Sequence, residues 1–125
     1  MAIPSGSGTE VLKSLNYVGV DNATWRDLLG SASGTTALHI YTVLSIIITD
    51  QAGSGNKVAR LRTIDADGSS NSTILFESIS IPANGNFVFN DKFVVTGGTR
   101  LQMIGDTSGA NFNVWCSYID QNWED

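Results

Sequence analysis

His39 is the only histidine of the chain and the first residue to test for catalysis, because serine and cysteine nucleophiles need a base within reach. It heads the most apolar run of the sequence, HIYTVLSIIIT, and no catalytic motif surrounds any candidate nucleophile. The one cysteine, Cys116, stands among aromatic residues in a strand pattern, where a buried, inert thiol is the usual case. The sequence therefore predicts a packed histidine and a protein that is not an enzyme.

Two stretches superficially resemble ligand-binding loops, and neither completes its pattern. Asp65, Asp67 and Gly68 resemble the start of a calcium loop, but Phe76 occupies the position of the bidentate glutamate. The glycine-rich run GSASGTT lacks the lysine of a phosphate-binding loop. Both are predicted to be turns, and no metal or cofactor is expected.

The elements that position these residues are predicted to be strands. Apolar or alternating runs bounded by turn-forming residues predict strands over 11–20, 37–49, 57–65, 72–81, 101–104 and 112–120. Residues 87–95 predict one bent strand or two short strands broken at 90–92, and a last hairpin is expected through 106–111. A helical turn is predicted after a cap at Asn22 or Thr24, because Trp25, Leu28 and Leu29 have helical spacing.

The run 37–49 is predicted to be the central strand, because both of its faces are largely apolar. Strict alternation divides its side chains into two sets: Leu38, Ile40, Leu44, Ile46 and Ile48 on one face, and His39, Tyr41, Val43, Ser45 and Ile47 on the other.

The number and spacing of the runs predict an all-β fold. About seven or eight strands at roughly ten-residue spacing are typical of an antiparallel β-sandwich or barrel, and a jelly roll is the first choice. A length of 125 residues suits one domain, which we place at 11–120. Residues 1–10 are predicted to be a flexible arm, either frayed or ordered on a neighbouring subunit, and residues 121–125 an acidic tail.

Charge and composition exclude several classes of partner. The net charge is −5 and the basic residues are scattered singly, which argues against direct binding of nucleic acid. The longest apolar run is far shorter than the ~20 residues that span a bilayer. The first residues, MAIPSGSGTE, lack the pattern of a signal peptide, so a soluble protein without a membrane partner is expected. A single cysteine favours a reducing compartment.

Aromatic residues concentrate late in the chain: Phe87, Phe89, Phe93, Phe112, Trp115, Tyr118 and Trp123. Most are predicted to be core, with the first three phenylalanines holding two sheets together. Trp123 differs because it lies in the tail, where it is either folded back on its own sheet or an anchor in another subunit. The predicted interface residues are Ile3, Pro4, Trp25 and Trp123.

Four segments carry a family resemblance: MAIPSGSGTEVL, HIYTVLSIIITDQAG, IPANGNFVFNDKFVVTGGTRLQM and VWCSYIDQNWED. Together they resemble the small β-rich virion structural proteins of tailed bacteriophages, over nearly the whole chain. The most specific part is the series of a proline-led turn, an FxFNDK step, a glycine turn, a short strand and a last strand ending in SYID.

The resemblance implies a non-catalytic component of a virion, made in the host cytoplasm. It favours a capsid cement or decoration protein that forms a symmetric oligomer, often a homotrimer, and contacts the major capsid protein or another virion protein. A neck, tail or baseplate component is the alternative within the particle. From a different class, a carbohydrate- or receptor-binding module could use Trp25, Trp115 or Trp123 to stack on a sugar.

Overall fold

The computed structural model describes residues 9–30, 38–65, 72–96 and 98–122, and these contain strands and no helix. The strands are β1 (Thr9–Val20), β2 (Arg26–Leu29), β3 (His39–Asp50), β4 (Lys57–Asp65), β5 (Ser72–Ile81), β6 (Asn86–Phe89), β7 (Phe93–Thr96), β8 (Thr99–Gly105) and β9 (Phe112–Asn122). None of the described segments is a helix long and apolar enough to cross a membrane. The predicted all-β class is confirmed.

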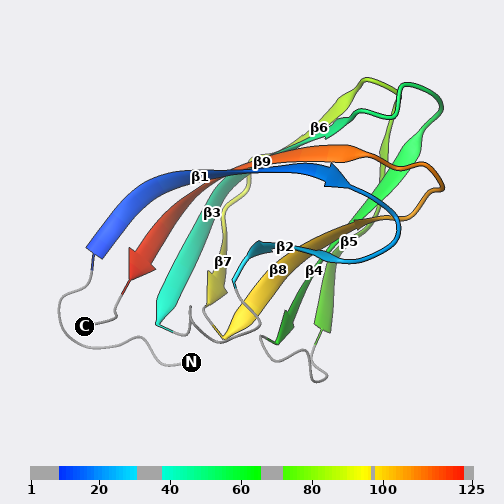
Figure 1. Ribbon diagram of the computed structural model, residues 1–125. Coiled ribbons are helices and arrows are strands. Elements are labelled where there is room, and N and C mark those ends of the chain that lie inside the picture. Colours follow the sequence, from blue (N-terminus) through cyan, green and yellow to red (C-terminus); the bar gives the residue numbers. More distant parts are fainter. Residues whose placement is uncertain (1–8, 31–37, 66–71, 97, 123–125) are drawn as a thin grey trace.

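The strands form two antiparallel sheets that pack as a sandwich (Figure 1). The first sheet has the order β1-β9-β3-β6, with β7 also paired to β3, and the second has the order β2-β8-β4-β5. Because β6 and β7 pair with successive halves of β3, they act as one broken strand. The chain is then one long hairpin, paired β1 with β9, β2 with β8, β3 with β6 and β7, and β4 with β5, and rolled into two layers. This is the predicted jelly roll.

Two local predictions were wrong. Residues 106–111 do not close a hairpin, because β8 and β9 lie in different sheets and the turn crosses between them. The segment after Trp25 is not helical but the short edge strand β2, in which Arg26 pairs with Met103 and Asp27 with Gln102. A register shift after Asp27 lets both Leu28 and Leu29 reach the core, which an isolated helical turn would not achieve.

The core lies between the sheets and is almost entirely aliphatic. Its largest fully buried side chains include Phe112, Ile46, Ile48, Leu61 and Met103. At one edge an aromatic group joins the two layers: the ring of Phe76 on β5 lies 4.9 Å from that of Phe89 and 6.1 Å from that of Phe87 on β6. Phe93 extends the group, with its ring 5.9 Å from Phe89. Phe87 and Phe89 thus join the sheets as predicted, whereas the ring contact of Phe93 lies within the first sheet.

Strand β3 is bent by a bulge, so its predicted faces were wrong over the first half. Val43 pairs with Tyr118 and Ser45 with Ser117, which leaves Leu44 as an extra residue. Tyr41 and Val43 therefore face the core before the bulge, and Ile46 and Ile48 face it afterwards. The break between β6 and β7 lies opposite the same point, so the two neighbouring strands bend together.

The two outermost strands in sequence are paired along their full length. Thr9 of β1 pairs with Asn122 of β9, so β1 starts and β9 ends at the same end of the sandwich. Strand structure thus extends into the last residues of the predicted arm and the first of the predicted tail. Three of the predicted interface residues, Ile3, Pro4 and Trp123, lie outside the described residues.

Candidate interaction surfaces

The histidine lies in a small ion-paired cluster at one end of the first sheet. The Nδ1 atom of His39 lies 2.7 Å from Asp120 Oδ1, and Lys13 Nζ donates to Asp120 Oδ2 at 2.8 Å. The ring of Tyr41 stacks on the imidazole at 5.7 Å, and the Asp120 side chain is only 5% exposed. Burial alone would raise the pKa of Asp120, but the hydrogen bonds with Lys13 and His39 outweigh it and the pKa lies below its usual value. His39 is the packed histidine that the sequence predicts.

The cysteine offers no reactive thiol. Cys116 points into the core from β9, is fully buried, and burial raises its pKa to about 12. At neutral pH it is therefore protonated, and the prediction of a buried, inert cysteine is confirmed.

The described residues contain neither a metal cluster nor a pocket. No group of three or more His, Cys, Asp and Glu side chains within them is placed to hold a metal ion, and their surface has no enclosed cavity. Of the sequence resembling a calcium loop, Asp65 ends β4, whereas Asp67 and Gly68 lie outside the described part. The candidate sites among the described residues are therefore the outer faces of the two sheets.

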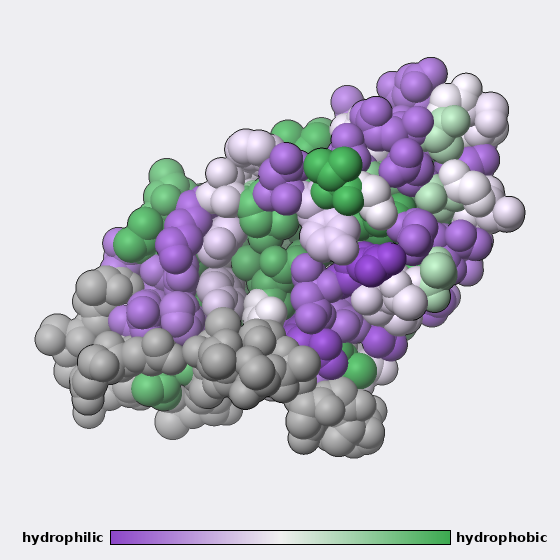
Figure 2. Space-filling model, in the orientation of Figure 1, coloured by the Kyte–Doolittle hydropathy of each residue, from purple (hydrophilic) through white to green (hydrophobic). Residues whose placement is uncertain are grey.

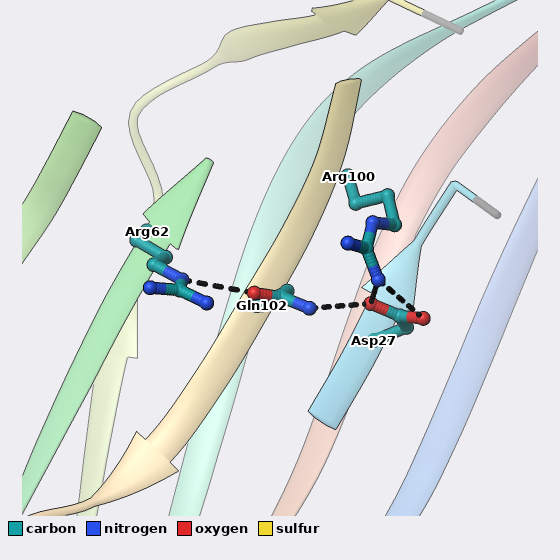
Figure 3. A network of polar contacts seen from close by, with 4 residues as sticks. All are labelled: Asp27, Arg62, Arg100 and Gln102. Atoms are coloured by element: carbon teal, nitrogen blue, oxygen red, sulfur yellow. Dashed lines mark hydrogen bonds and ion pairs between the residues drawn. The ribbon is translucent and has the colours of Figure 1, made fainter. Parts of the chain in front are cut away.

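The outer face of the second sheet carries a polar network, which we call the arginine face (Figure 3). Arg62 Nε on β4 donates to Gln102 Oε1 on β8 at 2.9 Å, and Gln102 Nε2 donates to Asp27 Oδ1 on β2 at 2.8 Å. Arg100 also pairs with Asp27, at 3.2 Å, so one carboxylate serves two donors. The network ties three strands together across the sheet.

Trp25 belongs to the same face. The Arg62 guanidinium lies 4.1 Å from the centroid of the indole, and that of Arg60 lies at 5.4 Å. Arg60 in turn pairs with Glu77 of β5 at 3.2 Å. Burial, with Arg100 and Arg60 close by, lowers the pKa of Arg62 from its ordinary value, although the group stays charged at neutral pH. One side of the Trp25 ring is covered by the Arg62 guanidinium. The role of Trp25 in an interface remains a prediction.

The outer face of the first sheet has the opposite character, and we call it the apolar face. Six large hydrophobic side chains on it are exposed: Leu12, Val18, Ile47, Val88, Val94 and Trp115. Between them lie Ile119 and small polar residues: Ser14, Asn16, Thr42, Ser45, Thr49, Asn86, Asn113 and Ser117. None of these outward positions is charged. From the side drawn in Figure 2, apolar and hydrophilic groups alternate along β1, and strongly hydrophilic groups lie over the second sheet.

The strand register places Trp115 in the middle of this face. Strand β9 lies between β1 and β3, and Trp115 is opposite Asn16 on one side and Ile47 on the other. Val88 follows in the same row, opposite Ile47. Trp115 is 47% exposed and is thus an exception among the late aromatic residues, most of which were predicted to be core, whereas Phe112 three residues earlier is fully buried.

The apolar face was missed from the sequence although a signal for it exists. Along β9 the residues that alternate with Phe112, Val114 and Cys116 include Trp115, and a strand with both sets apolar was interpreted as aromatic core. The alternation in β1 was more informative, because Leu12 and Val18 share a parity opposite to Leu15 and Tyr17. Once the inner set is known, the outer set is necessarily on the surface.

Comparison with known proteins gives structural matches alone. No protein family model matches the chain, and no curated protein matches its sequence. A subunit of Bacillus endospore appendages, described as a novel family of disulfide-linked pili, has a TM-score of 0.56 at 17% identity and aligns over 99% of this chain and 97% of that one.

A chain from infectious bursal disease virus, Gx strain, has a TM-score of 0.52 at 8% identity and covers 91% of this chain. The present chain spans 33% of that viral chain's length. At such identities the likeness concerns the fold. The structural neighbours are thus a bacterial pilus protein and a viral capsid protein, both of them structural subunits.

Proposed function

We propose that this chain is a non-catalytic structural subunit of a virion, a capsid cement or decoration protein of the kind that tailed bacteriophages carry. The apolar face is the observation that carries the proposal. Contiguous exposed apolar surface is rare on a soluble protein that works alone and is common where a protein meets a partner. Trp115 supports this, since tryptophan is among the residues that contribute most to binding.

The fold and the sequence support the same role. Chains with a similar fold come from a bacterial pilus and from a virus, and the sequence resembles virion proteins from its first segment to its last. The Asp120 cluster and the arginine face pair their charged side chains within the chain. Its partners under this proposal are other copies of itself and the major capsid protein or another virion protein, and its location is the particle.

The test is direct binding to shells. The purified chain is mixed with shells assembled from the major capsid protein of its own particle and sedimented, and the complex is imaged by electron microscopy. Co-sedimentation in a fixed ratio and density for the jelly roll on the shell are expected. Density in the neck, tail or baseplate of the intact particle would move the chain to that part of the virion, and no density anywhere would end the proposal.

A carbohydrate-binding module is the second candidate, because an exposed indole with polar neighbours is a common platform for a sugar ring. Trp115 has Asn16 beside it on β1 and Ser117 two residues along β9. A glycan array, followed by titration with tryptophan fluorescence as readout, tests this candidate. If no sugar changes the fluorescence of the wild type, or if Trp115→Phe leaves a response intact, this site is not a sugar platform.

A further inference from the structure

Resting on the proposed function, we infer that the apolar face packs against the same face of a second copy of this chain, in a two-fold symmetric dimer. The occupant of the face is thus another sheet of the same kind, and Trp115 of each copy lies near the symmetry axis. Sheets commonly pack face to face in this way, with their strands roughly aligned and ~30° apart.

The exposure of the face is the first step. Leu12 is 71% exposed, Val18 66% and Val94 58%, and these residues come from the two strands β1 and β7, on opposite sides of β9 and β3. The register places Leu12 and Val94 in one row across the sheet and Trp115 in another. The row between these two consists of serines, and Val18 lies in the row on the other side of Trp115. A layer of this kind resembles the inner face of a sandwich more than its outer face.

The distribution of charge favours contact between copies through the apolar face. Two copies that each carry a net charge of −5 repel one another, and the repulsion is smallest where the contact itself is uncharged. No charged side chain stands among the outward positions of the face between Leu12 and Val18. Glu10 lies at the end of the same register, hydrogen-bonded to Gln121, and the uncharged area beyond it suits a partner that is equally neutral.

The apolar face is large enough for a stable dimer. The paired strands of the first sheet extend roughly 30 Å, and four strands across give roughly 19 Å, by ordinary strand spacings. The projected area is then about 600 Å², and its accessible area is larger because side chains stand out from it. A standard interface takes about 800 Å² from each partner, so the face is of the size that a stable dimer needs.

The position of the exposed hydrophobic residues favours a two-fold contact over a ring. A ring, such as the trimer that the family resemblance implies, joins two different patches of the subunit, so it needs a second apolar surface to receive the first. Among the described residues the remaining exposed hydrophobics are divided: Val11 and Leu38 at one end, and Ile74 and Leu75 on β5. The arginine face is charged. A face without a complementary second patch meets itself, and the contact is two-fold.

The experiment is sedimentation equilibrium of the full chain, with folding checked by circular dichroism. The wild type is expected at twice the mass of the chain. Trp115→Arg places a like charge at the centre of the contact, so we expect its dissociation constant to rise at least ~30-fold. The matched control is Leu75→Arg, which adds the same charge at an apolar residue of the second sheet that is 38% exposed, and its dimer is expected to be unchanged.

A second variant, Leu12→Arg, replaces the most exposed member of the face and serves if Trp115→Arg does not fold. A wild-type trimer, or a dimer that persists in both face variants, overturns the inference. A monomer that still binds shells also overturns it and leaves the proposed function standing, with the shell protein as occupant. A monomer that binds neither itself nor shells removes both. A monomer whose tryptophan fluorescence responds to a sugar overturns it in favour of the carbohydrate platform.

Discussion

The two outer faces of the sandwich are built from the same strand geometry and end in different surfaces. On the arginine face, charges are present and already paired with one another, through Asp27, Glu77 and the bridging amide of Gln102. On the apolar face the one outward pair with a charge is at its end, where Gln121 donates to Glu10, and the tryptophan is left open. Trp25, in contrast, lies under two guanidinium groups.

The difference indicates which face has its charged groups paired within the monomer. The charged groups of the arginine face are paired with each other, although Nε of Arg60 and of Arg100 is buried without a hydrogen-bond partner. A partner would first have to desolvate these charged groups, so the face gains little from binding. On the apolar face, the exposed Leu, Val, Ile and Trp side chains that lie between small polar residues gain from any partner that removes them from water. One chain thus combines a face suited to solvent with a face suited to assembly.

The largest loss of stability is expected from a substitution in the core that both sheets share. Phe112→Ala removes a fully buried ring between the sheets and should lower the free energy of unfolding by about 3–5 kcal/mol. Urea unfolding is followed by the fluorescence of variants that retain either Trp25 or Trp115, one reporter for each sheet. Both reporters should shift together, and a shift of one alone would show that the sheets unfold separately.

Gly19 and Gly30 lie at irregularities of the edge strands β1 and β2, and their substitution by alanine should have different effects on stability. Gly30, after β2, has φ +90°, and an added Cβ would lie 2.5 Å from the Thr99 carbonyl oxygen. Gly19, in the bulge of β1, has φ +85° with nothing within 4 Å. Gly30→Ala should therefore cost more than 2 kcal/mol, roughly, and Gly19→Ala about 1 kcal/mol, since only the first adds a backbone clash to the strain. Equal melting temperatures in the two variants would contradict this.

The Asp120 cluster should give the first sheet a pH dependence. The pKa of Asp120 is lowered below 3.8, so its contribution is present above that pH and lost as the pH falls through the folded-state pKa. The hydrogen bond to Asp120 raises the pKa of Lys13 above 10.5, so that contribution is present below 10.5 and lost as the pH rises further. Melting temperatures of the wild type should fall on both flanks, and those of Asp120→Asn should change less. Parallel curves would exclude the cluster as the cause.

The smallest effect is expected on the arginine face. Arg62→Ala removes a contact with Trp25 and a hydrogen bond to Gln102, on a partly exposed surface, and should cost about 1 kcal/mol. Arg62→Lys keeps the charge but loses the planar stacking group, and should recover only part of the loss. Tryptophan emission should shift in both variants while the oligomeric state stays constant. A change in oligomeric state would move the interface to this face.

Strand positions were largely predictable because turn residues mark them. Pro82 ends β5 after Ile81, and the limits of β4 and β5 agree with the predicted ranges. The pairing of strands was predictable only as a fold class, since a turn such as 106–111 has the same sequence character whether it closes a hairpin or crosses between sheets. Tertiary pairing decided that question, as it did for β2.

The direction of side chains was less predictable than the strands. Leu44 is an unmarked extra residue in a continuous apolar run, and a single extra residue reverses the faces of everything before or after it. The same limit applies to Trp115, because a tryptophan fits a core and an interface equally well by composition. The Asp120 cluster joins residues far apart in the sequence, so no local pattern announces it.

Cys116 has a consequence for how any assembly of this chain is held. The pilus protein with a similar fold is described as disulfide-linked, whereas here the one cysteine is sealed inside β9 and kept protonated. Covalent linkage between folded copies would have to open the core first. Any contact between folded copies is therefore expected to be non-covalent, to weaken on dilution and to be unchanged by a reducing agent.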